Sequence, residues 1–292
     1  MNLPVILLAI VGATIVIVVS VCLFAWIHVC PPKFATRRSP SDSGISYEDI
    51  SFCARDGLCI RGWLTDVGKR RGIIILCHGY AFNRSMMLEF LPFLNRAGFQ
   101  VLLFDFRASG RSDGRRSTLG QHEVRDLLGA VDYLSDRPDT VDVPIGVLGL
   151  SMGGAVAIMA AAECEQIKGV VADSSFATLE RAAWQRFKLF LGPLGPLIGR
   201  PAVWFAQQFL GVDLSSVQPV SRVSQISPRP LFLIHGDRDR MILPADSLIL
   251  FNAGREPKEL WIVEGAGHGA SHRTEIATYE RKTAEFFSQA LA

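Results

Sequence analysis

The sequence lacks the features of three common kinds of binding site. Its six cysteines include no CxxC pair and no Cys/His spacing of the kind that binds zinc, so we expect no metal site. The net charge is only +2 and the charged residues are mixed in sign, so nothing indicates nucleic-acid binding. The segment Gly146–Gly149 lacks the third glycine and the acidic residue of a dinucleotide site, and we therefore expect no cofactor.

Charged side chains are also absent from the N-terminus, where no Asp, Glu, Lys or Arg precedes Lys33. The run from Leu3 to Val29 is almost wholly apolar and is long enough to cross a bilayer as a helix. A cleaved signal peptide is the rival interpretation, but it would carry a basic n-region, a shorter apolar run and a small-residue cleavage site. A buried core helix would need polar positions that are missing here. We predict that residues 1–32 form an uncleaved transmembrane anchor.

The residues that follow this run predict how the protein lies in the membrane. Lys33, Arg37 and Arg38 come directly after it, whereas only the α-amino group precedes it. By the positive-inside rule, this asymmetry predicts a single-pass protein whose remaining chain lies on the cytoplasmic side. Residues 31–44 are polar and rich in Pro and Ser, and we expect residues 33–44 to form a tether.

Strand and helix patterns alternate from residue 45 to the end, with no linker between them. A hairpin is predicted in residues 45–64, and Cys53 and Cys59 flank its turn as cross-strand neighbours whose pairing would depend on the compartment. Further strands are predicted at 73–77, 100–105, 143–148, 169–172, 230–234 and 259–263, and helices at 86–96, 119–134, 155–164, 245–253 and 274–290. The alternation of buried strands with helices predicts one α/β domain, with a mostly parallel sheet covered by helices on both faces.

The strongest chemical signal is the segment Gly149–Gly153, which reads G-L-S-M-G. It stands between a predicted strand and an Ala-rich predicted helix, which is the order of elements in a nucleophile elbow. There the serine occupies a sharp turn, and small residues on either side let the strand and the helix pass closely. Ser151 is therefore the candidate nucleophile, and the Met152 amide at the helix N-terminus is a candidate oxyanion donor.

A serine hydroxyl needs a base to take its proton and an acid to orient that base. The last two strands are followed by polar groups, which read H-G-D-R-D from His235 and G-A-G-H-G from Gly265. Both groups would lie at the sheet edge where open α/β sheets place their sites. His268 is the candidate base, and the candidate acids are Asp237, Asp239 and, after an earlier strand, Asp173.

With these motifs in place, the sequence resembles the α/β-hydrolase-fold serine hydrolases over nearly all of residues 45–292. By motif it is most similar to compact, membrane-anchored esterases, lipases and thioesterases. The shared motifs are a His-Gly at His78, D-x-R-x-x-G-x-S from Asp105, G-x-S-M-G-G, H-G-x-x-D and a G-x-x-H end. Ala108 departs from the pattern, because many relatives have glycine there.

The resemblance implies particular roles for the site residues. It assigns the acid to Asp239, whereas Asp237 is expected to bind its own loop backbone and Asp173 stays a minor alternative. It implies that the amides of Met152 and Tyr80 form the oxyanion hole. Asp105 and Arg107 are expected to hold the neighbouring loop by a charge-assisted hydrogen bond.

Residues 176–214 break the alternation with an aromatic-rich segment that reads as two amphipathic helices. We expect them to form a small lid over Ser151, and ordinary packing helices are the alternative. The sequence therefore predicts a hydrolase that cleaves ester or thioester bonds of acyl-chain lipids. A serine peptidase of the same fold and a non-catalytic ligand-binding protein are the alternatives.

Overall fold

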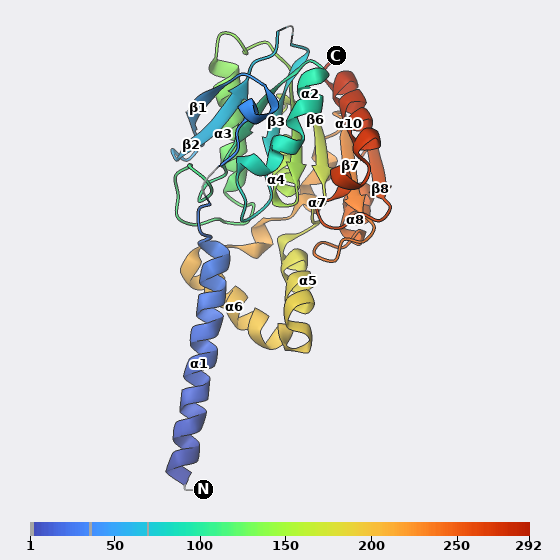
Figure 1. Cartoon of the computed structure of the whole chain (residues 1–292). Helices are drawn as coiled ribbons and strands as arrows, with labels where there is room; N and C mark the ends of the chain where they lie inside the picture. The colour runs from blue at the N-terminus through green and yellow to red at the C-terminus, as the bar shows by residue number, and fades with distance from the viewer. Residues whose placement is uncertain (1–2, 35–36, 69) are drawn as a thin grey trace.

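The computed structural model describes residues 3–34, 37–68 and 70–292. The chain forms one eight-stranded sheet in the order β1-β2-β4-β3-β5-β6-β7-β8 (Figure 1). β1 pairs antiparallel with β2, β2 pairs antiparallel with β4, and the remaining neighbours are parallel. The predicted fold class, an α/β-hydrolase fold with a mostly parallel sheet, is confirmed, and its antiparallel hairpin lies at one edge.

The elements follow the predicted order. The strands are β1 Tyr47–Cys53, β2 Cys59–Thr65, β3 Gly72–Cys77, β4 Phe99–Phe104, β5 Ile145–Leu150, β6 Ile167–Asp173, β7 Leu231–Gly236 and β8 Lys258–Val263. The helices are α1 Leu3–Val29, α2 Leu91–Arg96, α3 Glu123–Asp136, α4 Met152–Glu163, α5 Leu179–Leu191, α6 Gly195–Leu210, α7 Pro219–Arg222, α8 Ala245–Ala253, α9 Ser271–Thr274 and α10 Ile276–Ala290. Cys53 and Cys59 lie opposite each other across the hairpin, as free thiols.

Two predicted helices have different starts. The helix predicted over 86–96 is a 3-10 turn, Arg84–Glu89, followed by α2, because Pro92 lies in the first turn of α2 and has no N–H to continue an earlier helix. The helix predicted from residue 119 begins at Glu123 instead. The Glu123 carboxylate accepts hydrogen bonds from Ser117, Thr118 and Gly120, and these bonds fold the preceding residues into a turn.

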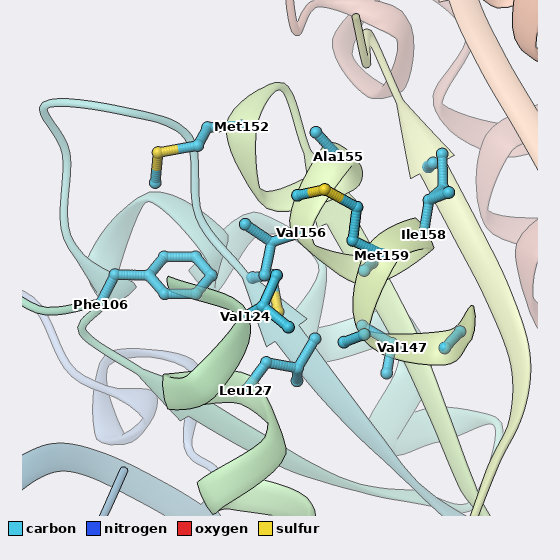
Figure 2. Close-up of a cluster of buried hydrophobic side chains, with 14 of the residues drawn as sticks. Phe106, Val124, Leu127, Val147, Met152, Ala155, Val156, Ile158 and Met159 are labelled. Atoms are coloured by element: carbon cyan, nitrogen blue, oxygen red, sulfur yellow. The ribbon is translucent and has the colours of Figure 1, made fainter. Parts of the chain in front are cut away.

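The core lies on both faces of the sheet. Alternate side chains of β3 point to opposite faces, so that Ile73 and Ile75 join the core under α3, α4 and α8, while Ile74 and Leu76 join the core under α2 and α10. Figure 2 shows part of the first core, where Val156 of α4 lies beside Val124 of α3. Helix α4 is buried along nearly its whole length, which fixes the position of its N-terminus and of the residue before it.

Helix α1 projects away from the sheet, and α6 contacts its C-terminal part (Figure 1). In the part of the chain that the structure describes, it is the one helix long and apolar enough to cross a membrane. Its early turns are exposed, whereas Val21, Ala25 and Val29 are buried against the rest of the protein. Beside it, α5 and α6 form the predicted pair of inserted helices between β6 and β7.

Candidate active site

Ser151 lies at the turn between β5 and α4 with backbone angles of φ 56° and ψ −117°. A non-glycine residue with positive φ is strained, and strain of this kind is typical of the serine in a nucleophile elbow. The neighbouring glycines are needed for space. A Cβ on Gly149 would lie 2.2 Å from the Gly153 carbonyl oxygen, and one on Gly153 would lie 2.1 Å from the Cys77 carbonyl oxygen. The G-x-S-x-G pattern therefore reflects close packing of strand and helix at this turn.

Two hydrogen bonds connect Ser151 to the predicted base and acid. The His268 Nε2 atom lies 3.0 Å from the Ser151 Oγ atom, and the His268 Nδ1 atom lies 2.7 Å from Oδ2 of Asp239. With the Nδ1 proton donated to the carboxylate, Nε2 is free to accept the serine proton. The three residues come from the ends of β5, β7 and β8, as predicted from the sheet edge.

Asp239 is held as a carboxylate although its side chain is buried. Burial by itself raises the pKa of Asp239, but hydrogen bonds from His235 and His268 outweigh it and lower that pKa to about 2. The Oδ1 atom accepts two further bonds, from the backbone N–H groups of Met241 and Ile242 at 2.9 and 3.0 Å. Asp239 is therefore ionised at neutral pH and can act as the negative partner of His268.

The oxyanion donors predicted from the sequence face no competing acceptor. Met152 is the first residue of α4, so no carbonyl one turn earlier accepts its N–H. The Tyr80 N–H makes no hydrogen bond to the residues that the structure describes. His78 holds the loop after β3 in place. One of its ring nitrogens bonds to the Gly79 carbonyl, and the other accepts from the Phe106 N–H. Burial lowers the pKa of His78, which keeps the ring neutral.

The other candidate acids lie elsewhere. Asp173 is buried and accepts hydrogen bonds from the hydroxyls of Ser174 and Ser271, not from His268. Asp237 was predicted to bind its own loop, and this is wrong: its carboxylate accepts from the Gly265 N–H on the loop after β8. By geometry, Asp239 alone of the three candidates reaches His268.

The loop after β4 is held by charges, but the predicted pairing between Asp105 and Arg107 is wrong. Asp105 instead accepts from the backbone N–H groups of Arg84 and Arg111 at 2.8 Å. Arg107 forms ion pairs with Asp126, at 2.6 Å, and with Asp56, at 2.8 Å. Asp105 therefore stabilises the loop through Arg111 within it and Arg84 outside it, and Arg107 does so through two partners on other segments.

An apolar pocket opens beside Ser151 and Met152. Its walls come from the inserted helices α5 and α6, from the loops after β3 and β7 and from the last turns of α1. The α1 residues that line it are Phe24, Ala25, His28 and Val29. Nearly all other lining residues are hydrophobic, and the polar exceptions are Ser151, Tyr80, His28 and Arg186.

Three residues at this site were not singled out as site residues by the sequence analysis. His28 lies in the pocket, and its backbone carbonyl accepts a hydrogen bond from the Tyr80 hydroxyl. Arg186 lines the pocket from α5, and His235 lies behind Asp239. The signal for His28 is a titratable side chain in an otherwise apolar run, and the signal for His235 is its place in the H-G-x-x-D motif. Arg186 had no distinctive spacing.

This arrangement can transfer an acyl group without a metal or a cofactor, because it holds a nucleophile, a base, an acid and two free N–H groups around one point. Among the residues that the structure describes, no group of three or more His, Cys, Asp or Glu side chains could hold a metal ion. Asp126, Asp56 and Glu123 are already bound by arginine or by hydroxyl and amide donors.

Comparison with known proteins gives matches over most of the chain. A family model described as serine aminopeptidase, S33, matches residues 68–207. The uncharacterized protein YqkD of Bacillus subtilis is 28% identical over 236 residues, which cover 79% of this chain and 75% of the relative. The polyketide transferase ATR5 of Stachybotrys chlorohalonatus is 26% identical over 265 residues, which cover 76% of this chain and 89% of the relative.

Among solved structures, the Pyrococcus furiosus esterase Pf2001 matches with a TM-score of 0.78 at 28% identity, over 91% of this chain and 99% of the esterase. The sheet topology and these matches together show that the chain has the α/β-hydrolase fold. The proteins that it is similar to include an esterase of that fold.

Proposed function

We propose that the protein is a serine hydrolase that cleaves carboxylic ester or thioester bonds through Ser151, His268 and Asp239. The observation that carries this proposal is the chain of hydrogen bonds from the Ser151 hydroxyl through His268 to the Asp239 carboxylate, beside an apolar pocket. In the acylation step, Ser151 Oγ attacks the substrate carbonyl carbon and its proton passes to His268 Nε2. The same nitrogen then gives that proton to the leaving alcohol or thiol.

The tetrahedral intermediate carries a negative oxygen, which the N–H groups of Met152 and Tyr80 bind. One such donor contributes roughly 3–4 kcal/mol of transition-state stabilisation. Hydrolysis of the acyl-enzyme repeats the sequence with water as the nucleophile and His268 as its base. Asp239 stays ionised and stabilises the imidazolium that forms in each step.

The pocket favours an acyl-chain substrate. Its walls are apolar, and they are made in part by α1, which we propose to be an uncleaved membrane anchor comprising residues 1–32. A cleaved leader would take Phe24, Ala25, His28 and Val29 away from the pocket that they line. We propose that residues 33–44 are the tether, that 45–292 are the catalytic domain, and that the insertion at about 176–214 is its lid.

We further propose that the catalytic domain lies on the cytoplasmic side of the membrane. Lys33 is exposed after α1, as are Arg37 and Arg38, and this is the charge bias that the positive-inside rule needs.

A serine peptidase is the second candidate, because the matching family model is described as a serine aminopeptidase. The same triad would release an amine in place of an alcohol. The two candidates are separated by offering matched acyl esters and aminoacyl amides to the same preparation. An amide turned over faster than its ester would favour the peptidase.

The test uses the full chain in a non-ionic detergent, because removal of α1 would open the pocket. A series of p-nitrophenyl esters from acetate to palmitate is offered to the wild type, to Ser151→Ala and to Ser221→Ala. Ser221 is the control, because it is an exposed serine outside the candidate site. We expect turnover that rises with chain length, its loss in Ser151→Ala, and no change in Ser221→Ala. Equal activity in wild type and Ser151→Ala would refute the proposal, and inactivity of every form would favour a non-catalytic binding protein.

A further inference from the structure

Arg186 is an unusual residue for the pocket in which it lies. It projects from α5 into a cavity whose other walls are almost entirely hydrophobic. Of the pocket-lining residues that the structure describes, it is the one with a permanent charge. Its side chain is half-buried, and its guanidinium carbon lies 6.0 Å from the centre of the Tyr80 ring.

The charge of Arg186 has no partner of opposite sign among the described residues, since none of their carboxylates lies within ion-pair distance. Arg181, on the same helix, shows the contrast, because it pairs with the buried carboxylate of Asp246 at 3.1 Å. Burial lowers the pKa of Arg186, which reflects the cost of holding a cation in apolar surroundings. An anionic ligand would offset this cost, because it would give the guanidinium a partner of opposite charge.

Arg186, on α5, lies beside the C-terminal end of α1, and this position indicates where the ligand would come from. α1 has 27 residues and is about 40 Å long, whereas the hydrocarbon core is about 30 Å thick. The last turns of α1 therefore reach the layer of lipid head groups. Arg186 lies at this level, because it contacts the Tyr80 ring and the Tyr80 hydroxyl donates to the carbonyl of His28.

The inserted helices also carry exposed aromatic side chains. Phe190 on α5 lines the pocket and is 63% exposed, whereas Trp204 and Phe209 on α6 lie outside the pocket lining and are 58% and 60% exposed. Helix α6 packs against α1. Aromatic side chains are enriched where a protein meets the membrane interface. The pocket is therefore bounded by elements suited to the lipid surface, with a cation inside.

We propose that Arg186 binds an anionic group carried by the acyl-lipid substrate, so that the pocket selects single-chain lipids with a negatively charged head group over neutral ones. This inference rests on the proposed function, because it names the substrate class of the same site. The guanidinium can donate two parallel hydrogen bonds to a phosphate or carboxylate, which makes recognition depend on more than charge.

Binding of ether lipids tests the inference without hydrolysis. The probes are 1-O-oleyl glycerol 3-phosphate, which is anionic, and 1-O-oleyl glycerol, which is neutral, both added to the full chain in non-ionic detergent. We expect Arg186→Gln to lower the affinity for the anionic probe roughly 10- to 100-fold and the affinity for the neutral probe less than about threefold. Arg186→Lys should fall between, because a lysine keeps the charge and loses the bidentate geometry.

Lys188→Gln is the matched control, since it removes a positive charge from the same helix at an exposed position outside the pocket. It should leave both affinities unchanged if the effect of Arg186 is local. Glycerol 3-phosphate, which has the anion without the chain, should not displace the probe. Equal effects of Arg186→Gln on both probes, an equal loss in Lys188→Gln, or displacement by glycerol 3-phosphate would overturn the inference.

Hydrolysis is then measured on 1-oleoyl-lysophosphatidylglycerol and 1-oleoylglycerol. We expect Arg186→Gln to raise the KM of the anionic ester alone, with kcat nearly unchanged. A wild type that binds the anionic probe through Arg186 but cleaves no ester would refute the proposed function and leave the binding inference standing. Turnover of both esters with no dependence on Arg186 would support the proposed function and overturn the binding inference.

Discussion

His235 Nε2 lies 3.3 Å from Oδ2 of Asp239, the same oxygen that accepts the hydrogen bond from His268. The Asp239 carboxylate thus lies between two imidazole rings, one facing Ser151 and one fully buried behind it. Burial lowers the pKa of His235, but its hydrogen bonds to Asp239 and to the Ile242 carbonyl outweigh this and raise that pKa. His235 is therefore a positioning residue for the acid.

The first prediction concerns this contact. We expect His235→Leu to lower kcat on a p-nitrophenyl ester about tenfold with KM nearly unchanged, because the carboxylate loses a buried partner. His235→Gln, which keeps a donor near the Nε2 position, should retain most of the activity. The prediction is contradicted if the Leu variant has wild-type kcat, or if Leu and Gln lower it equally.

The second prediction concerns acid stability. The folded pKa of Asp239 is about 2, below the value of about 3.9 for an unfolded aspartate. A lowered folded pKa contributes stability that is present above the unfolded value and is lost as the pH falls through the folded value. The contribution is about 2–3 kcal/mol, and most of it disappears between about pH 5 and 2.

Urea unfolding of wild type and Asp239→Asn at several pH values measures this contribution. The free energy of unfolding of the wild type should fall more steeply toward low pH than that of the variant. The variant should also lose roughly 10³- to 10⁴-fold in kcat, because its amide no longer stabilises the imidazolium. Parallel pH profiles of stability would show that Asp239 is not held in this way.

The third prediction tests the close packing at the elbow. A Cβ on Gly153 would lie 2.1 Å from the Cys77 carbonyl oxygen, a backbone atom of a central strand that cannot move aside. We expect Gly153→Ala to destabilise the protein by more than about 3 kcal/mol or to abolish folding. Gly154→Ala is the control, because its nearest contacts are at 3.1 Å and the loss should stay below about 2 kcal/mol. Thermal melts that rank the two variants in the opposite order would contradict this packing.

The fourth prediction concerns the buried pair of Arg107 and Asp126. Arg107→Met leaves the Asp126 carboxylate buried without its main partner, which should cost about 3–5 kcal/mol. Adding Asp126→Leu removes the stranded charge and should restore a large part of that loss. A double-mutant cycle from urea unfolding measures the coupling, and additive losses would contradict the assignment.

The fifth prediction concerns the role of α1 in the pocket. Ala25 lines the pocket and is 4% exposed, so Ala25→Trp should fill space that a long acyl chain needs. We expect hydrolysis of the palmitate ester to fall at least about tenfold while hydrolysis of the acetate ester changes little. Leu23→Trp, at a side chain that is 55% exposed, is the control and should have no effect. Equal loss on both esters would indicate general disruption.

Much of the fold could be predicted from the sequence, because the central strands such as β3 and β5 are apolar runs that end at turns with a strong chemical pattern. Ser151, His268 and the set of candidate acids could be predicted for the same reason, since parallel strand ends meet at one edge. The choice of Asp239 over Asp237 came from the family resemblance and agrees with the geometry at His268.

The remaining features depend on tertiary contacts that no local pattern records. Arg107 pairs with Asp126 and Asp56, which lie 19 and 51 residues away, and not with its neighbour Asp105. The contribution of α1 to the pocket depends on how that helix packs against α6. Its apolar sequence predicts where it can lie relative to a membrane, but not which of its side chains face the protein.

The central claim is that Ser151 is a nucleophile activated by His268, and labelling with a fluorophosphonate tests it most directly. The reagent is added to the full chain and to His268→Gln, and the modified residue is identified by peptide mass spectrometry. The account predicts labelling at Ser151 in the wild type, at close to one label per chain, and a rate at least about 10³-fold lower in His268→Gln. Labelling at another residue, or labelling of Ser151 at the same rate without His268, would contradict it.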